Sequence, residues 1–294
     1  MNFSLSQVLE HFGMPQRPFT SAPDPQFMYW SARHKRAQAV LDYGIMTCAP
    51  ITLITGDIGL GKTSILRSLL NTPDPKLTIG LVGNASPEDR SEMLRLILIA
   101  LGQTAAEGIG YANLYSQLEA LLIEEYRAGR RVILIFDEAQ NLSVQSLEHL
   151  RMLTNINFAE HELVQLVLIG QPELRETLSR PELRQLAQRI SANAALTELT
   201  AAEVREYVAH RLAVAGATRQ IFSDSALELI YERSGGVPRV VNQICEYCML
   251  YAFGDDAHEV TAETVELVVQ ENFVFGVGRD TTLRLVEDAR DARS

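Results

Sequence analysis

The residues best suited to chemistry form a glycine-rich run, GDIGLGKTS, at residues 56–64. An apolar run precedes it at 51–54, and a helical pattern of isoleucine and leucine follows it at 65–70. A P-loop needs this order, because its glycines let backbone N–H groups surround phosphates at the N-terminus of a helix. The flanking strand and helix favour this interpretation over a chance match in a glycine-containing turn. The predicted nucleotide-binding residues are Gly56, Asp57, Ile58, Gly59, Leu60, Gly61, Lys62, Thr63 and Ser64.

Two side chains of this run have expected chemical roles. Lys62 is placed to contact the β and γ phosphates of a nucleotide, and the Thr63 hydroxyl is placed to bind Mg²⁺. The expected cofactors are therefore ATP or ADP together with Mg²⁺.

An acidic pair follows a second apolar run. Residues 132–136, VILIF, are typical of a parallel strand buried on both faces, and Asp137 and Glu138 come directly after it. We expect Asp137 to hold Mg²⁺ through water and Glu138 to polarise the water that attacks the γ-phosphate. Isolated acids at a helix entry would mean little, but together with the P-loop they predict hydrolysis.

Two amide side chains follow two other predicted strands. Asn84 closes the predicted strand at 77–83, where its amide either restrains Glu138 until a ligand binds or serves as an ordinary turn residue. Gln171 follows the predicted strand at 163–169, which we place between the first and third strands of the sheet. We therefore expect its amide to face the γ-phosphate and the attacking water.

Several arginines are candidates to neutralise the charge that develops on the γ-phosphate, often from a neighbouring subunit. Arg189 directly precedes the last predicted strand and is the best candidate for such a finger, whereas Arg180 and Arg184 are better explained by surface ion pairs. Arg239 follows a Gly-Gly-Val-Pro run at a helix start. It either caps that helix or reaches back to the phosphates and couples this part of the chain to the nucleotide.

The composition limits the class of protein. The 294 residues are 47% hydrophobic and 21% charged, which is ordinary for a globular chain of one large or two modest domains. The net charge of -11 disfavours broad binding to nucleic acid but leaves room for a local basic patch. With only three cysteines we expect no disulfide framework, and the pair Cys245 and Cys248 is better explained by core packing than by a lone zinc half-site.

Strand and helix patterns alternate through the first two thirds of the chain, and only helical patterns follow. Strands are predicted at 51–55, 77–83, 132–136, 163–169 and 192–199. Helices are predicted to begin at Ser86-Pro87, to span 112–127 and to begin near Ser143. Further helices are predicted after a Thr200 to Glu203 capping box and at 223–233, 238–253 and 262–272. The pattern favours a parallel α/β sheet covered by helices and then a separate helical bundle.

As a set, these motifs resemble the AAA+ superfamily. Within it the chain is similar to the ExeA/GspA family, the ATPase component of general secretion pathway assembly, and to short exopolysaccharide-associated relatives. The resemblance spans about residues 11 to 242 and is carried by HFGMPQRPF, PDPQFMYWSARH, LDYGI, GDIGLGKTS, FDEAQNLS, LIGQPELRETL, RPELRQLAQRI and SGGVPRVVN. It implies an α/β fold with a P-loop AAA+ five-stranded parallel sheet, helices on both faces, and an all-α helical lid domain.

The resemblance also implies roles and boundaries. Walker A is at Gly56–Thr63, Walker B at Asp137 and Glu138, sensor 1 at Gln171, the arginine finger at Arg189 and sensor 2 at Arg239. The N-terminal segment belongs to the adenine end of the pocket, with Phe19 and Tyr43 as base contacts, although Phe19 could instead fill the core. The implied domains are an N-terminal linker at 1–50, the nucleotide-binding domain at 51–199, the lid at 200–275 and a tail at 276–294.

Three functions remain open at this point. The leading one is a cytoplasmic ATPase that forms a ring or partial ring and acts on an envelope secretion or polysaccharide-export partner, which would hold it at the inner membrane. Full-length secretion members continue into a membrane segment and a periplasmic domain, and we expect neither here. The alternatives are a DNA-associated regulator of transposition, with basic clusters at 33–36 and 127–131, and a nucleotide-switched scaffold with little turnover.

Overall fold

The computed structural model describes residues 4–20, 24–84, 86–105, 108–158 and 160–271. It divides the chain into two compact units. Ala32–Thr197 form the first, here called the sheet unit, and Met1–Ser31 with Glu198–Ser294 form the second, here called the helical unit. The segment predicted as one N-terminal piece, residues 1–50, is thus divided after residue 31. The predicted tail at 276–294 lies outside the described residues.

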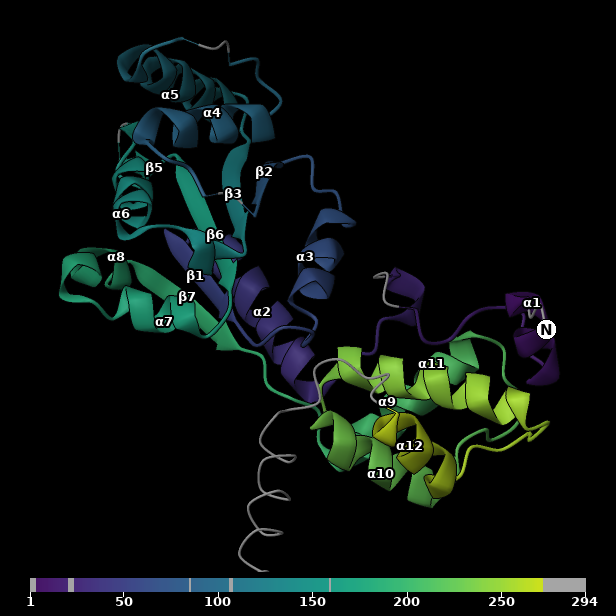
Figure 1. Cartoon of the computed structure of the whole chain (residues 1–294). Coiled ribbons are helices and arrows are strands. Elements are labelled where there is room, and N and C mark those ends of the chain that lie inside the picture. The colour runs from purple at the N-terminus through teal and green to yellow at the C-terminus, as the bar shows by residue number, and fades with distance from the viewer. Residues whose placement is uncertain (1–3, 21–23, 85, 106–107, 159, 272–294) are drawn as a thin grey trace, which may run out of the picture. The chain divides into compact units, whose positions relative to one another are not determined.

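The sheet unit is built on a five-stranded parallel sheet with the strand order β2-β3-β6-β1-β7 (Figure 1). These strands are β1 (Ile51–Thr55), β2 (Leu77–Gly83), β3 (Arg131–Asp137), β6 (Val164–Gly170) and β7 (Ile190–Ala195). A separate two-residue pair, β4 (Asn157–Phe158) and β5 (His161–Glu162), is antiparallel. The predicted α/β class and the place of the fourth predicted strand between the first and third are confirmed. The last strand begins two residues earlier and ends four residues earlier than predicted.

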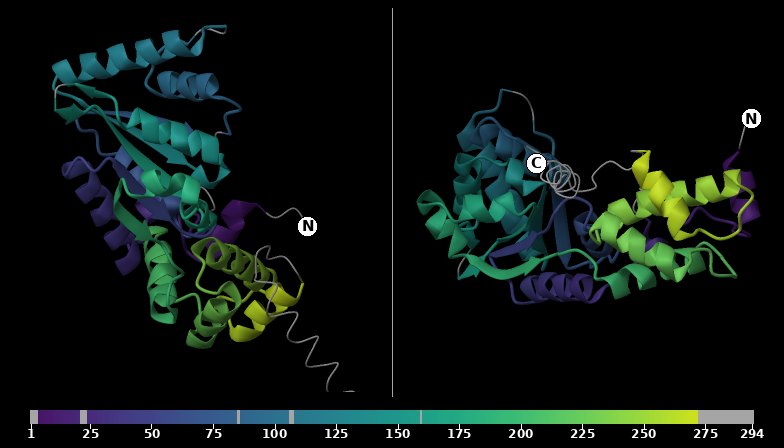
Figure 2. Two further views of the ribbon diagram at one scale, coloured as in Figure 1. Left: turned by 90° about the vertical axis from the view of Figure 1, so that its left-hand side faces the viewer. Right: turned by 60° about the horizontal axis from the view of Figure 1, so that its bottom comes forward.

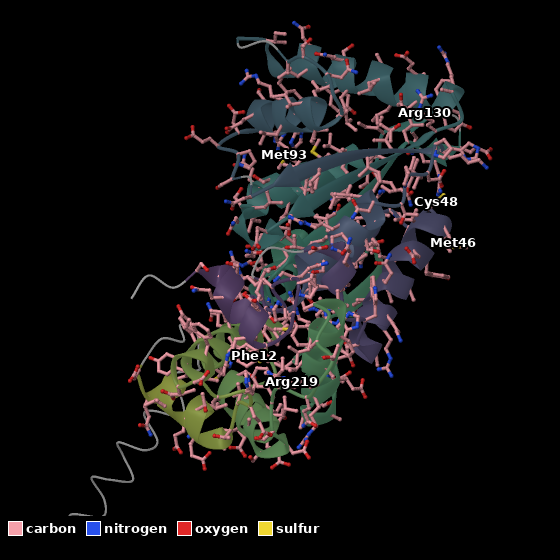
Figure 3. The ribbon with its side chains drawn as sticks, turned by 90° about the vertical axis from the view of Figure 1, so that its right-hand side faces the viewer. Phe12, Met46, Cys48, Met93, Arg130 and Arg219 are labelled. Carbon is pink, nitrogen blue, oxygen red and sulfur yellow. The ribbon has the colours of Figure 1, made fainter. Side chains whose placement is uncertain are left out.

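The central strands of the sheet are buried on both faces, as continuous apolar strands require. In β1 and β6 every residue is buried. Alternate strand residues such as Leu53, Leu134 and Leu168 belong to a core shared with the helices α4 (Arg90–Ala100), α5 (Tyr111–Arg127) and α6 (Val144–Leu153). The opposite face carries α2 (Ala32–Met46) and α3 (Lys62–Leu70). Met93, labelled in Figure 3, is a buried residue of α4 in the core shared with α5 and α6.

Helix α4 begins later than predicted. Its N-cap is Asp89, whose side chain accepts a hydrogen bond from the backbone N–H of Glu92 at 2.8 Å. Ser86 and Pro87 therefore lie in the loop before the helix. Asp89, three residues after Ser86, is the residue that accepts from a free N–H of the first turn. The other short elements of this unit are η2 (Ala139–Asn141), α7 (Glu173–Leu178), η3 (Pro181–Leu183) and α8 (Arg184–Ala187).

The helical unit contains α1 (Leu5–His11), η1 (Pro25–Phe27), α9 (Ala201–Val214), α10 (Asp224–Ser234), α11 (Pro238–Gly254) and α12 (Ala262–Gln270). Helices α10, α11 and α12 lie side by side (Figure 2). The predicted capping box of α9 is confirmed: Thr200 accepts from the Glu203 N–H, and Glu203 accepts from the Thr200 N–H. Cys245 and Cys248 are both buried in this core, and burial raises the pKa of Cys248 to about 12.

The N-terminal segment is part of the helical core. Phe12, labelled in Figure 3, is 1% exposed and belongs to the same apolar cluster as α9 to α12. Arg211 of α9 is buried and donates to the carbonyl of Pro18 at 2.6 Å, and its guanidinium lies 5.2 Å from the ring centre of Phe27. These contacts explain why residues 1–31 group with the helical unit.

Candidate nucleotide-binding site

The glycine-rich loop joins β1 to α3, as predicted. Gly59 and Gly61 have φ angles of 84° and 94°, in the left-handed region where a side chain would be strained. A Cβ on Gly56 would lie 2.9 Å from Cβ of Leu196, so the loop approaches the chain after β7 too closely for any larger residue. The backbone conformation of the loop therefore favours glycine at positions 56, 59 and 61.

Lys62 is the first residue of α3 and is 6% exposed. Its Nζ donates to the carbonyl of Gly56 at 2.6 Å and to that of Asp57 at 3.0 Å. Burial lowers the pKa of this ammonium, and the nearby carboxylates of Glu138 and Asp137 partly oppose the effect. The cation thus sits under the loop, where incoming phosphate oxygens can replace the two carbonyls as its acceptors.

The predicted acidic pair lies at the carboxyl end of β3. Asp137 is the last residue of the strand, and its Oδ1 accepts from the backbone N–H of Glu138 at 3.0 Å. Burial raises the pKa of Asp137, with the charge of Glu138 adding to the rise, while the Glu138 N–H and Lys62 oppose it. Glu138 itself has a left-handed backbone, φ 55° and ψ 39°, which begins a sharp turn into η2.

Two amide groups hold the Glu138 carboxylate. Gln140 donates from Nε2 to Oε2 of Glu138 at 2.6 Å, and Gln171 donates from Nε2 to the same oxygen at 3.4 Å. Gln171 therefore lies beside the acid, and its expected role of facing the γ-phosphate and the attacking water stays a prediction. Gln140 was not predicted, although its position two residues after Glu138 in the DEAQ run is a signal that points to it.

Asn84 forms its hydrogen bonds with residues other than Glu138. Its Oδ1 accepts from Nδ2 of Asn141 at 3.0 Å, and its backbone N–H donates to the carbonyl of Asp137 at 3.3 Å. With φ at 47°, Asn84 adopts the left-handed conformation that asparagine tolerates in turns. The expected restraint of Glu138 by Asn84 is thus replaced by Gln140, because the turn after β3 brings Gln140 back to the carboxylate.

Arg189 lies at the entry to β7, and its guanidinium is occupied within the sheet unit. One terminal nitrogen donates to Thr154, at 3.2 Å to the carbonyl and 2.8 Å to Oγ1, and lies 3.4 Å from Oε1 of Glu162. The other donates to Asn155. The role as a finger toward a neighbouring subunit stays a prediction, and it would require these contacts to break.

The remaining predicted residues are distributed between the units. Arg239 is exposed in the first turn of α11, in the helical unit, and its role as a sensor stays a prediction. Phe19 is 2% exposed and packs edge-on against Phe222 with 5.9 Å between ring centres. The structure therefore places Phe19 in the helical core, the alternative interpretation, rather than free to stack on a base. Tyr43 is 62% exposed on α2.

His34 contacts the glycine-rich loop, and the sequence does not predict this contact. It lies on α2, is 4% exposed, and its Nε2 is 2.8 Å from the carbonyl of Leu60. A Cβ on Gly61 would lie 2.7 Å from the same nitrogen. Its position in the SARH run gave no periodic signal of this contact, because α2 and the loop meet only through the fold.

The donors of this site suit a magnesium nucleotide. Thr63 is exposed at the start of α3 and supplies a hydroxyl, and Asp137 supplies a partly buried carboxylate. Hydroxyl and carboxylate oxygens are the ligands that Mg²⁺ takes, usually with waters and substrate phosphates. The glycine loop and the buried ammonium of Lys62 add groups that suit phosphate oxygens.

Comparison with known proteins agrees with this geometry. Residues 46–178 match the AAA domain family. Over 262 residues, 89% of this chain, the sequence is 37% identical to general secretion pathway protein A of Aeromonas hydrophila. The chain therefore contains an AAA domain and is similar to general secretion pathway protein A over most of its own length. It spans about half of the length of that relative, 48%.

Solved structures share the fold of this chain at low sequence identity. The Cdc6p protein of Pyrobaculum aerophilum has a TM-score of 0.67 at 17% identity, covering 89% of this chain and 74% of its own. The ORC2 protein of Aeropyrum pernix, solved as ADPNP and ADP complexes, has a TM-score of 0.66 at 17% identity, covering 87% and 71%. These likenesses confirm the predicted sheet with its C-terminal helices. Within the described residues, none of the helices has the length and apolar character to cross a membrane.

Proposed function

We propose that this GspA-like protein binds ATP with Mg²⁺ and hydrolyses it to ADP and phosphate. The observation that carries the proposal is the position of the Glu138 carboxylate. It follows the carboxyl end of β3, at the same edge of the parallel sheet as the glycine loop that follows β1. The charges of Glu138 and Asp137 act to raise the pKa of Lys62, so the ammonium and the two acids are close enough to interact. A phosphate cradle, a cation and a candidate base therefore converge.

The residues of this chain have separate tasks in the proposed reaction. Lys62 exchanges the carbonyls of Gly56 and Asp57 for the β and γ phosphates, and the loop N–H groups bind the same oxygens. Glu138 accepts a proton from the attacking water, and Gln171 orients the γ-phosphate and that water. Thr63 and Asp137 would hold Mg²⁺, which neutralises charge on the phosphates when it is bound.

We further propose that the protein works as an oligomer on the cytoplasmic side of the envelope. Support for the setting comes from the similarity to general secretion pathway protein A, whose name connects that protein with secretion. A nucleotide cycle that changes the angle between subunits would then act on an envelope secretion or polysaccharide-export partner. The similarity leaves the choice between these two partners to experiment.

Two substitutions separate binding from hydrolysis. Lys62→Ala should lose nucleotide binding, because no other buried ammonium of the described residues lies under the loop. Glu138→Gln should still bind but release phosphate at least about a hundredfold more slowly, since removal of a general base typically costs that much. Binding is measured with a fluorescent ATP analogue, and turnover by phosphate release.

Matched controls lie nearby. Lys76→Ala removes an exposed lysine, and Glu176→Gln neutralises an exposed acid of α7, so both should behave as the wild type. Unchanged turnover in Lys62→Ala and Glu138→Gln would refute the site. Tight ATP binding without measurable turnover in the wild type would instead favour the nucleotide-switched scaffold.

The DNA-associated alternative has little support from the basic cluster at 127–131. Arg127 lies over the ring of Phe158 at 5.6 Å, and Arg130 forms a 2.7 Å ion pair with Glu125. Arg131 donates to the carbonyl of Ile45 in α2 and to Cys48, which lies just after α2 and is labelled in Figure 3. These arginines are engaged with the protein itself, which weakens any phosphate-binding role.

A further inference from the structure

The side chain of Gln140 connects two parts of the proposed active site. Its Nε2 donates to Oε2 of Glu138 at 2.6 Å, and its Oε1 accepts from the backbone N–H of Gln171 at 3.0 Å. One carboxamide thus uses both of its functional ends, one on the candidate base and one on the turn that follows β6. Gln140 is partly buried in η2, so neither contact is freely exchanged with solvent.

The arrangement leaves one oxygen of the base available. Both amide donors, from Gln140 and from Gln171, point to Oε2 of Glu138. Oε1 of Glu138 has no hydrogen-bond partner among the described residues. A carboxylate fixed through one oxygen presents the other in a defined direction, and that direction is what a general base needs to accept a proton from water.

The backbone around Gln140 is shaped for this contact. A Cβ on Gly170, the last residue of β6, would lie 2.9 Å from Oε1 of Gln140 and 3.3 Å from its backbone nitrogen. The left-handed turn at Glu138 folds η2 back toward the strand end, which brings Gln140 beside the residue two positions before it. The close approach therefore depends on a glycine in β6 and a strained turn after β3.

We propose that Gln140 is the positioning residue of the hydrolytic site: it orients the Glu138 carboxylate and ties it to the turn that carries Gln171. The proposal rests on the proposed ATPase function. Gln140 touches neither nucleotide nor water in it and acts only through Glu138. Movement of the Gln171 turn, which faces the γ-phosphate in the proposed function, is thereby transmitted to the base.

Two substitutions at position 140 separate orientation of the base from support of the turn. Gln140→Met keeps the length of the side chain and loses both hydrogen bonds. Gln140→Glu keeps an acceptor for the Gln171 N–H but replaces the donor with a second carboxylate, which repels Glu138. Gln145→Met, at an exposed position of α6, is the matched control.

The expected result is a loss of kcat with an unchanged KM for ATP. We expect kcat to fall about tenfold to a hundredfold in Gln140→Met, because a misplaced group costs that much, and at least as far in Gln140→Glu. Binding of the fluorescent ATP analogue should not change, and Gln145→Met should match the wild type. Wild-type turnover in Gln140→Glu would overturn the proposal, because it would show that only the acceptor for Gln171 matters.

A second measurement tests the contact without turnover. Gln140→Met and Glu138→Ala are combined, and the urea midpoints of the single and double variants are compared. Groups in contact give shifts that do not add, whereas independent groups give additive shifts. Additive shifts would overturn the proposal even in a protein that releases no phosphate. Non-additive shifts in a protein without turnover would support the Gln140 contact and contradict the ATPase function alone.

Discussion

At the scale of single residues, the environment of His149 shows how burial sets a charge. His149 lies in α6, is 0% exposed, and its Nε2 is 3.1 Å from the Tyr111 hydroxyl. Its Nδ1 has no hydrogen-bond partner among the described residues. Burial lowers the pKa of His149 from 6.5 to about 4, and the charge of Arg90 adds to this effect. The folded protein therefore keeps the ring neutral at pH values where the unfolded chain protonates it.

This shift predicts a pH-dependent stability. The folded pKa is below the unfolded value, so the contribution of His149 is fully present above pH 6.5 and is lost as pH falls from 6.5 toward about 4. At pH 5 the loss is about 2 kcal/mol. Urea midpoints at pH 7 and pH 5 should therefore differ more in the wild type than in His149→Gln. The exposed His161→Gln should keep the wild-type difference, and an equal difference in His149→Gln would contradict the assignment.

At the scale of elements, the contact of α2 with the sheet depends on one glycine. Gly44 is buried on α2, in the LDYGI run, and a Cβ there would lie 2.2 Å from Oγ1 of Thr52 in β1 and 3.3 Å from Cβ of Ala192 in β7. The helix can approach these strands closely because position 44 has no side chain. This packing accounts for the glycine that follows Tyr43, the residue that the resemblance assigned to base binding.

The close approach predicts the sign of a substitution. Helix propensity alone would make Gly44→Ala more stable by about 1 kcal/mol. The clash with buried Thr52 should outweigh this gain and lower the free energy of unfolding by about 1–3 kcal/mol, as overpacking does. Gly254→Ala, at the end of α11 with nothing within 4 Å of the added Cβ, is the control and should not lose stability. A Gly44→Ala protein with the wild-type urea midpoint would rule out the proposed packing role.

At the scale of the whole molecule, the proposed oligomer gives Arg189 two alternative sets of contacts, one within its own unit and one with the nucleotide of a neighbouring subunit. In the structure it binds Thr154, Asn155 and Glu162 of its own unit. A finger that reaches the γ-phosphate of a neighbouring subunit must give up these contacts. Assembly would have to compensate that loss through the charge of the bound nucleotide.

Subunit mixing tests this exchange. Arg189→Ala and Glu138→Gln proteins should each turn over slowly, whereas an equal mixture should regain part of the activity. The gain is expected because an intact Glu138 site on one subunit can receive Arg189 from its neighbour. Particle mass, measured by light scattering, should rise with a non-hydrolysable ATP analogue. A mixture no faster than the average of its components would exclude a shared site, and Arg180→Ala in place of Arg189→Ala is the control.

The sequence by itself determined the elements and the chemical types at their ends. Glycine spacing, buried apolar strands and the acids after β3 are local patterns, so they predicted the loop, the strands and the chemical types of the side chains at the strand ends. Capping residues likewise predicted α9, although Asp89 rather than Ser86 begins α4. These features follow from neighbours in the chain, which a sequence shows directly.

The tertiary structure alone decided which side chains pair. In it Glu138 accepts a hydrogen bond from Gln140, Asn84 accepts one from Asn141, and Phe19 packs against Phe222. Each choice depends on where a turn or a helix from elsewhere in the chain comes to lie within a few ångströms. Hydrogen bonds and packing are decided at that range, and no local periodicity encodes it.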